Sequence, residues 1–310
     1  GTGEVIALYG GKDYLVRQLN DATQSIALAG STFKPFALAG ALEAGIPLTS
    51  MWNGDTPQVF DDAGKPYEVN NYGDEGWGQI DLLTATAHSV NTVYVPLGIK
   101  VGPDKVVDVA RRAGIPDSVA MMPTPSVVLG AASPHVIDVA SAYATFAAQG
   151  VYAQPWFIVE VKGANGGLLY QANPPTPQEV FSKDVMADLT YALQQVVNNG
   201  TATYGTSGLG RPAAGKTGTS EQNASAWFSG YTPQLAASVS MFRDDASQTL
   251  NGIGGLNSVT GGTFPAKIWT AFMKGALNGQ PVLSFPAPVH IGGTDPVVMT
   301  SGGHQTMKKK

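Results

Sequence analysis

The spacing of apolar residues predicts a series of helices through the first two thirds of the chain. Apolar side chains recur three and four positions apart over residues 33–42, and a Gly and a Pro shortly afterwards mark the end of that helix. Ser133 with Pro134, and Ser182, are N-terminal capping signals for two later helices. The same spacing predicts further helices over residues 81–88, 92–97, 104–113, 136–146 and 185–197.

The pattern changes after residue 200. Short apolar runs separated by turn residues predict three strands in an antiparallel meander, over 213–219, 226–231 and 235–242. A last helix is predicted over 265–277. Earlier in the chain, residues 4–9 are typical of a short strand and residues 156–170 of a β-rich insertion. Residues 51–78 are rich in Asp, Asn, Gly and Pro, which predicts a long loop.

Strands near both ends with helices between them predict an α+β fold of more than one lobe. We expect an antiparallel sheet built from both ends of the chain and flanked by helices, with a mostly helical lobe inserted. This domain would cover residues 1–280, with a sheet lobe of about 1–45 and 201–280 and a helical lobe of about 46–200. Residues 281–310 are rich in Pro and Gly, and we expect an extended or mobile tail there. A cleft between the lobes is the expected place for a site.

Composition then excludes several classes of protein. The chain of 310 residues has no Cys, so it has no disulfides, no Cys-based zinc site and no thiolate nucleophile. Its net charge of −5 argues against a nucleic-acid partner. No segment is long and apolar enough to span a membrane. Because the chain begins with Gly1 and not with Met, we expect a fragment whose anchor lies in a missing N-terminal part.

One pair of residues at a predicted helix start suits nucleophilic catalysis. Ser31 and Lys34 are three positions apart, so their side chains share one helical face. A partly desolvated lysine can take the proton of a serine hydroxyl and so activate it. Taken alone, such a pair is more often a capping serine and a solvated surface lysine.

Two further motifs carry polar groups that could serve such a site. Ser89 and Asn91 lie at the break between two predicted helices, where they could relay a proton and hold a substrate amide. The run Lys216-Thr217-Gly218-Thr219 lies in a predicted strand and could recognise a carboxylate. Each also has a plain structural reading, as helix punctuation and as the polar face of an edge strand.

Other patterns indicate no second chemistry. Residues 210–217 match the phosphate-binding loop pattern, but they neither follow a buried strand nor open a helix. The four histidines lack metal-ligand spacing, so we expect no metal and no cofactor. The carboxylate pairs Asp61-Asp62 and Asp244-Asp245 are expected to be solvated.

The three motifs in this order resemble those of the serine penicillin-recognising enzymes. The likeness includes Gly3–Ala7, Asn20–Thr23, Gly30–Phe36, Ala140–Phe146 and Ala226–Tyr231, and it resembles the transpeptidase domain of a bifunctional class A penicillin-binding protein. It covers residues 3 to 277, and the tail lies outside it.

The resemblance implies a D,D-transpeptidase that crosslinks peptidoglycan. Ser31 would attack the D-Ala–D-Ala bond of a stem peptide, and an amine from a neighbouring stem would take over the acyl group. By resemblance, Lys34 is the base and Ser89 passes a proton to the leaving amine. The backbone N–H groups of Ser31 and Thr219 would form the oxyanion hole. Five residues would bind the substrate: Asn91, Lys216, Thr217, Gly218 and Thr219.

The resemblance also implies partners and alternatives. β-Lactam antibiotics would acylate Ser31, the domain would work on the outer face of the cytoplasmic membrane, and cell-wall synthesis proteins are possible partners. A D,D-carboxypeptidase or a non-catalytic β-lactam sensor would share the motifs. A class A β-lactamase would have Asp where this chain has Val90, and neither Glu160 nor Glu179 stands in the Glu-x-x-x-Asn pattern that such an enzyme uses.

Overall fold

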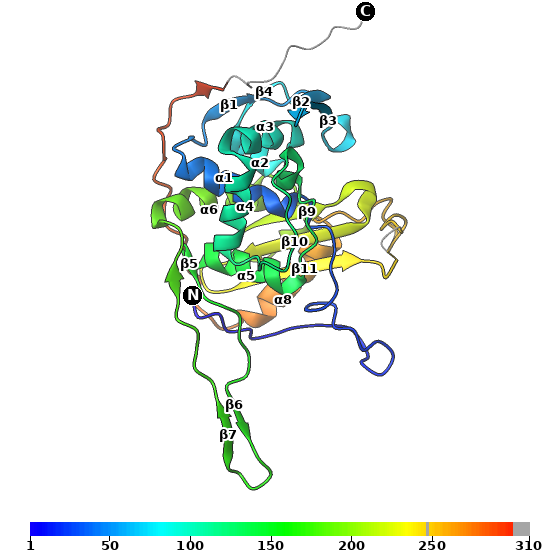
Figure 1. Cartoon of the computed structure of the whole chain (residues 1–310), viewed down its shortest axis with the longest axis vertical. Coiled ribbons are helices and arrows are strands. Elements are labelled where there is room, and N and C mark those ends of the chain that lie inside the picture. The colour runs from blue at the N-terminus through cyan, green and yellow to red at the C-terminus, as the bar shows by residue number, and fades with distance from the viewer. Residues whose placement is uncertain (246–247, 300–310) are drawn as a thin grey trace, which may run out of the picture.

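The centre of the molecule is a three-stranded antiparallel sheet (Figure 1). The computed structural model describes residues 1–245 and 248–299. In the sheet, β10 (Ser225–Tyr231) lies between β9 (Ala214–Thr219) and β11 (Ala236–Phe242). The predicted meander is therefore confirmed.

Helices cover both faces of this sheet. α8 (Phe264–Ala276) packs on one face, where the rings of Trp269 and Phe228 meet edge to face with centroids 5.1 Å apart. On the other face, Thr190 of α6 (Lys183–Asn198) and Tyr231 share a hydrogen bond of 2.9 Å. Since both faces are covered, every residue of β10 is buried, and its sequence does not alternate between apolar and polar residues.

α1 (Lys34–Glu43) is the central helix. All its residues from Lys34 to Leu42 are buried, and it packs against α6 and against two helices of the inserted segment. Every helix predicted from the apolar spacing is present, so those predictions are confirmed. The remaining α-helices of the described residues are α2 (Leu82–Ala87), α3 (Asn91–Val101), α4 (Pro103–Ala113), α5 (Val136–Ala147) and the short α7 (Thr203–Thr206).

The predicted cap of α5 is wrong. The helix is capped by His135 instead of Ser133, and it starts at Val136. The side chain of Asp138 accepts a hydrogen bond of 2.9 Å from the backbone N–H of His135, as in a capping box. Ser182 does cap α6 as predicted, because its hydroxyl accepts a hydrogen bond from the N–H of Val185.

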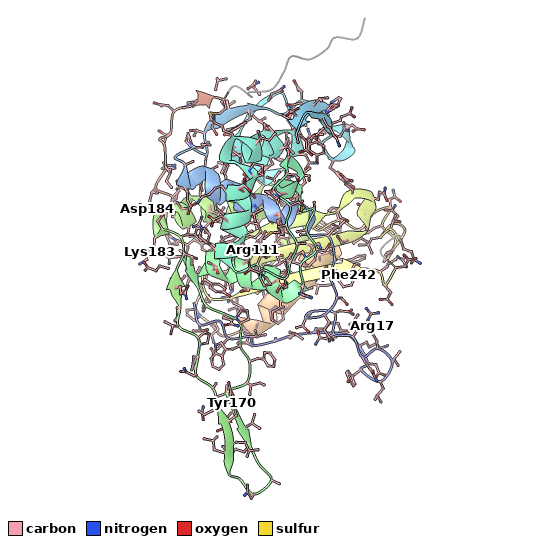
Figure 2. The ribbon with its side chains drawn as sticks, viewed as in Figure 1. Arg17, Arg111, Tyr170, Lys183, Asp184 and Phe242 are labelled. Carbon is pink, nitrogen blue, oxygen red and sulfur yellow. The ribbon has the colours of Figure 1, made fainter. Side chains whose placement is uncertain are left out.

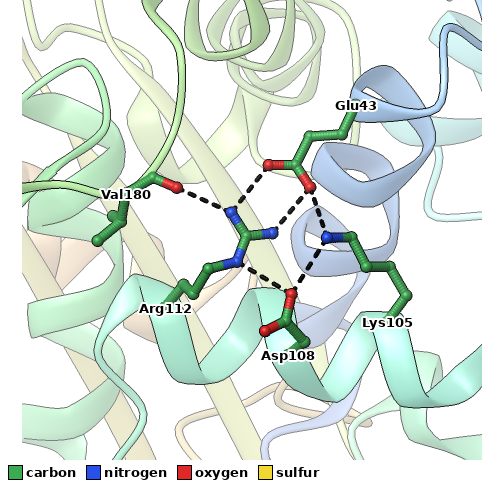
Figure 3. Close-up of polar contacts among 5 residues, drawn as sticks. All are labelled: Glu43, Lys105, Asp108, Arg112 and Val180. Atoms are coloured by element: carbon green, nitrogen blue, oxygen red, sulfur yellow. Dashed lines mark hydrogen bonds and ion pairs between the residues drawn. The ribbon is translucent and has the colours of Figure 1, made fainter.

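A cluster of charged side chains fixes the C-terminal end of α1 (Figure 3). Arg112 of α4 donates to both carboxylate oxygens of Glu43, at 2.8 and 2.7 Å, and to the carbonyl oxygen of Val180, at 2.8 Å. Lys105 lies 3.1 Å from both Glu43 and Asp108. The cluster thus joins α1, α4 and the segment that leads into α6.

The predicted β-rich insertion is a hairpin that projects from the body (Figure 1). β6 (Glu160–Lys162) pairs antiparallel with β7 (Leu168–Gln171), and Tyr170 lies on the projecting part (Figure 2). At its base, β5 (Val151–Tyr152) pairs with β8 (Gln178–Glu179). The insertion is confirmed as β structure.

Residues 4–9 do not join the sheet, so the expected strand there, and a sheet built from both ends, are wrong for the described residues. The segment makes a single bridge, between Glu4 and Trp156. The edge of the sheet at β9 is instead covered by the turn around Gly30. Three apolar side chains of the N-terminal segment are left exposed: Ile6, Leu8 and Tyr9.

Residues 51–78 are also more ordered in secondary structure than the predicted loop. A hairpin forms over residues 58–69, with the turn residues Ala63 and Gly64 at positive φ and the buried side chains of Phe60 and Val69 facing the core. Of the Asp and Gly residues that suggested a loop, Asp62 and Gly64 lie at its turn. The strands of this region are β1 (Ser50–Asn53), β2 (Gln58–Asp62), β3 (Lys65–Val69) and β4 (Gln79–Asp81).

The C-terminal segment from residue 281 to 299 is extended, as expected, and several contacts attach it to the body. The fully buried carboxylate of Asp188 in α6 accepts backbone hydrogen bonds of 2.7, 3.0 and 2.7 Å from residues 289–291. Further on, β12 (Val297–Val298) pairs parallel with β1. The rest of the predicted tail, residues 300–310, lies outside the described residues.

Replacing Asp188 should release this segment. Asp188→Ala removes the acceptor for three backbone N–H groups, and we expect the free energy of unfolding to fall by about 1.5–3 kcal/mol. Amide hydrogen exchange at residues 289–291 should accelerate at the same time. Asp184→Ala, at an exposed position of the same helix, is the control and should leave the exchange unchanged. Unaltered exchange in Asp188→Ala would contradict the proposed attachment.

Candidate active site

Ser31 lies in a tight turn between the sheet edge and α1. The turn, Gly30–Phe33, is a short 3-10 helix that continues directly into α1. Gly30 has φ of +58°, and a Cβ on it would lie 2.9 Å from the backbone carbonyl carbon of Thr219. Only glycine fits there, so the turn is pressed against β9. The hydroxyl of Tyr143 also donates to the carbonyl oxygen of Thr32, at 2.9 Å.

Lys34 is completely buried one helical turn after Ser31. Its Nζ donates to the carbonyl oxygen of Ser89 at 2.5 Å and to Oδ1 of Asn91 at 2.7 Å. It lies 3.0 Å from the hydroxyl oxygen of Ser89. Ser89 and Asn91 are 55 and 57 residues after Lys34 in the sequence, so two of the predicted motifs meet at the Lys34 amine.

The break between α2 and α3 places Ser89 and Asn91. Ser89 has φ of +60°, which is uncommon for a residue with a side chain and turns its carbonyl oxygen toward Lys34. Asn91 is the first residue of α3, and its Nδ2 donates to the carbonyl oxygen of Asn70 at 2.8 Å. That hydrogen bond fixes the amide with Oδ1 toward the lysine.

The third motif lies on β9, the edge strand that faces the Ser31 turn. Lys216 is completely buried, and its Nζ donates to the carbonyl oxygen of Thr217 at 3.1 Å. A Cβ at Gly218 would lie 2.6 Å from the carbonyl oxygen of Ala29, so a larger residue would push the turn away. The hydroxyl oxygen of Thr219 accepts from the N–H of Gly261 at 3.3 Å.

Both lysines have lowered pKa values. Burial, and next the charge of Lys216, lower the pKa of Lys34 well below its ordinary value. Burial lowers the pKa of Lys216 to about 7. An uncharged Lys34 has two N–H donors and one lone pair, so it can donate to Ser89 and Asn91 and still accept a proton.

The hydroxyl of Ser31 forms no hydrogen bond with the described residues 1–245 and 248–299. The geometry thus places Ser89 and Asn91 on Lys34, and Ser31 beside Thr219 through the Gly30 contact. Catalytic hydrogen bonds often form only when substrate is bound, so the lack of a hydrogen bond between Lys34 and the Ser31 hydroxyl is compatible with proton transfer between them.

Two residues at the site carry no sequence signal that would have singled them out. The hydroxyl of Thr201 lies 2.6 Å from the hydroxyl of Thr217, and Asn70 orients Asn91 as described above. Both stand in polar, turn-rich segments, where Thr and Asn are ordinary residues. Only the tertiary fold brings them to the motifs.

The other candidates do not join the site. The phosphate-loop match is excluded by the fold, because Lys216 and Thr217 lie within a strand. Glu160 and Glu179 are exposed, on β6 and β8. Within the described residues no group of His, Asp or Glu could hold a metal ion. His304 lies outside those residues.

Two cavities lie elsewhere in the structure. One, of about 290 Å³, is lined by residues that include Phe146, Met186 and Phe285, and the other, of about 380 Å³, by residues that include Trp52 and Gln79. Neither includes a predicted site residue. Among the described helices, none has the length and apolar character needed to cross a bilayer.

A buried amine of lowered pKa close to a serine at a helix start suits acyl transfer by that serine. The fold is shared by solved structures of penicillin-binding proteins. Comparison with known proteins narrows the class further.

The chain belongs to the family described as the penicillin binding protein transpeptidase domain, whose sequence model matches residues 1–249. Among curated proteins, penicillin-binding protein 1A of Mycolicibacterium smegmatis is 34% identical over 311 residues, and that of Mycobacterium tuberculosis 35% over 315. Each match covers 94% of this chain but only 38% and 37% of the relative. The chain therefore spans little more than a third of their length.

Solved structures agree. PonA1 of Mycobacterium tuberculosis in complex with penicillin V superposes with a TM-score of 0.81 and 34% identity, covering 94% of this chain and 79% of that one. A second PonA1 structure also has a TM-score of 0.81, and it covers 97% of this chain and 81% of its own. The likeness thus reaches beyond residue 277, where the sequence resemblance was expected to stop. The family expected from the motifs is confirmed.

The buried lysines should make stability depend on pH. Lys216 has a pKa of about 7 when folded and about 10.4 when unfolded, so between these values the unfolded chain binds more protons. Its contribution to the free energy of unfolding should therefore rise with pH, by up to about 1.4 kcal/mol per unit from pH 7.5 to 9.5. Above that range, burial of Tyr94, Tyr143 and Tyr231, which raises their pKa values, acts in the opposite direction.

Urea unfolding at pH 7.5, 8.5 and 9.5 measures this dependence. Lys216→Met should flatten the rise seen in the parent protein, whereas Lys65→Met, at an exposed lysine, should keep it. Equal slopes for the parent and Lys216→Met would show that Lys216 stays charged in the folded protein.

Proposed function

We propose that this chain is a D,D-transpeptidase domain that crosslinks peptidoglycan stem peptides through an acyl-enzyme on Ser31. One observation carries the proposal. A completely buried lysine amine, one turn from a serine, contacts both Ser89 and Asn91, and burial lowers its pKa well below the ordinary value. That arrangement supplies a base where a serine nucleophile needs one.

In the first half-reaction, the hydroxyl oxygen of Ser31 attacks the carbonyl carbon between the two terminal D-Ala residues. Lys34 takes the hydroxyl proton as the new C–O bond forms. The negative oxygen of the tetrahedral intermediate lies between the backbone N–H groups of Ser31 and Thr219, two residues that the close contact of Gly30 with Thr219 brings near each other. When the C–N bond breaks, Ser89 passes a proton from Lys34 to the departing D-Ala amine.

In the second half-reaction, an amine of a neighbouring stem peptide attacks the ester. It loses its proton by the reverse route, through Ser89 to Lys34, and Ser31 leaves with that proton. The sum is exchange of one amide for another, with no net proton change. The 3.0 Å contact between the Lys34 amine and the Ser89 hydroxyl is the route that both halves use.

Substrate recognition follows from the hydrogen bonds already present. Asn91 accepts from Lys34 and donates one N–H to Asn70, which leaves its second N–H for a carbonyl oxygen of the stem peptide. Lys216, with Thr217 and Thr219, faces the end that carries the terminal carboxylate. An anion there raises the pKa of Lys216 from its value of about 7 and favours the ammonium form.

Structures of relatives with β-lactams support the acylation that we infer for this chain. Penicillin V is bound by PonA1, and imipenem forms an acyl-enzyme with penicillin-binding protein A of Mycobacterium tuberculosis, to which this chain has a TM-score of 0.72. We infer β-lactam acylation of Ser31 here by the same chemistry. We also place the domain on the outer face of the cytoplasmic membrane, where peptidoglycan is built, with cell-wall synthesis proteins as partners.

A penicillin should form a stable adduct on Ser31. Intact-mass spectrometry after mixing with benzylpenicillin should show the mass of the parent protein plus one penicillin, and Ser31→Ala should show none while keeping its thermal unfolding midpoint. Lys34→Ala should slow adduct formation by about 10²–10⁴-fold, since it removes the base. Lys65→Ala is the control at an exposed lysine. An unmodified parent mass would rule out the proposed nucleophile, and parental rates in Lys34→Ala would rule out the base.

Release of D-Ala distinguishes transpeptidation from related activities. A pentapeptide ending in D-Ala–D-Ala is incubated with the protein, with and without an amine acceptor such as glycine or a stem peptide. A transpeptidase should yield crosslinked product that depends on the acceptor. Release of D-Ala with water as the sole acceptor would indicate a carboxypeptidase. A stable penicillin adduct without D-Ala release would indicate a sensor.

A further inference from the structure

Thr201 touches the proposed carboxylate site without belonging to any of the three motifs. Its hydroxyl oxygen lies 2.6 Å from the hydroxyl oxygen of Thr217. It stands just after the end of α6, 16 residues before its partner in the sequence. Nothing in the proposed reaction, as described so far, requires this residue.

The backbone of Thr201 is held from two sides. Its N–H donates to the carbonyl oxygen of Ala87 at 3.1 Å, at the end of α2 and two residues before Ser89. Its carbonyl oxygen lies so close to Gly262 that a Cβ on that glycine would come within 2.1 Å of it. The position of the hydroxyl is therefore fixed relative to both the Ser89 loop and β9.

The role of this contact depends on which of the two hydroxyls, Thr201 or Thr217, donates the hydrogen bond. A hydroxyl has one proton to donate and two lone pairs to accept. Lys216 in its ammonium form can only donate, and its Nζ lies 3.5 Å from the Thr217 hydroxyl oxygen. A bound carboxylate can only accept. Thr217 can donate to the carboxylate only if its single proton is not already given to Thr201.

We infer that Thr201 is a positioning residue for carboxylate recognition: it donates its hydroxyl proton to Thr217, so that Thr217 donates to the substrate carboxylate. Lys216 and Thr201 then both donate hydrogen bonds to the Thr217 hydroxyl oxygen, and Thr217 donates its own hydrogen bond to the carboxylate. Thr201 thereby contributes to the preference for ligands that end in a free carboxylate. This inference rests on the proposed function.

Acylation by a penicillin and by its methyl ester tests the inference, because the two ligands differ only in the carboxylate. Second-order acylation rates are measured for benzylpenicillin and benzylpenicillin methyl ester with the parent protein, Thr201→Val and Thr201→Ser. Valine keeps the branched shape and loses the hydroxyl, whereas serine keeps the hydroxyl. Loss of one hydrogen bond to a charged ligand typically corresponds to about 10–100-fold.

Thr201→Val should therefore lower the acid rate by about 10–100-fold and change the ester rate by no more than about twofold. Thr201→Ser should restore most of the preference for the acid. Thr203→Val is the matched control: its hydroxyl donates to the carbonyl oxygen of Gly200 at 2.9 Å and does not contact Thr217, so its acid-to-ester ratio should equal that of the parent. Thermal unfolding of each variant establishes that it is folded.

The outcomes separate this inference from the proposed function. If the parent forms no adduct with either ligand, the proposed function is wrong, and the inference falls with it. If the parent forms adducts but Thr201→Val leaves the ratio of the acid rate to the ester rate unchanged, the inference alone is overturned. A failure of Thr201→Ser to restore the ratio would also overturn it, because the hydroxyl would then not be the group that matters.

Discussion

The amine of Lys34 is an ionisable group in a fully buried position, and much of the structure around the site serves to accommodate it. An unpaired buried charge is too costly to keep, and no carboxylate among the described residues lies against this lysine to neutralise it. Its polar partners are a carbonyl, a hydroxyl and an amide, all uncharged. The uncharged amine is therefore the form that the surroundings favour, and it is the form that a base requires.

Those partners can reach the amine only because separate elements meet with little space between them. The turn at Ser89 adopts a positive φ, which directs its carbonyl oxygen inward. At the opposite side of the site, Gly30 and Gly218 let the serine turn and β9 approach to backbone contact. Backbone in a sparsely populated conformation and glycines at close contacts are the local costs of bringing the three motifs together.

Much of this could be predicted from the sequence, for identifiable reasons. The helices around Phe36 and Val93 and the strand around Phe228 are runs of buried, mostly apolar residues bounded by turn residues, so their limits are visible in the chain. The eight motif residues were recognised by their order and residue types. By contrast, the hairpin over 58–69 has only two buried hydrophobic side chains, Phe60 and Val69, among residues that are otherwise mostly polar or exposed. Residues 4–9 have strand-like composition, but they make only one bridge, between Glu4 and Trp156, and pair with neither edge of the sheet.

Contacts between distant polar residues were beyond the reach of sequence patterns. Thr201 and Asn70 stand in segments where their types are common, and nothing in their spacing links them to Thr217 or Asn91. Asp188 looks like one more acid on an amphipathic helix, yet it holds a segment about a hundred residues away. Such pairings are fixed by how whole elements pack, and one sequence without its fold does not contain that information in readable form.

The two ends of α1 are built on opposite principles. Its first turn holds a desolvated amine beside the serine, which works against folding. Its last turn is anchored by the ion pairs of Glu43 with Arg112 and Lys105 (Figure 3). Stability and reactivity are thus assigned to different ends of the same helix. Changes around Ser31 that alter substrate choice at some expense in stability can be tolerated as long as the anchored end remains intact, which gives the domain room to evolve its chemistry without giving up its framework.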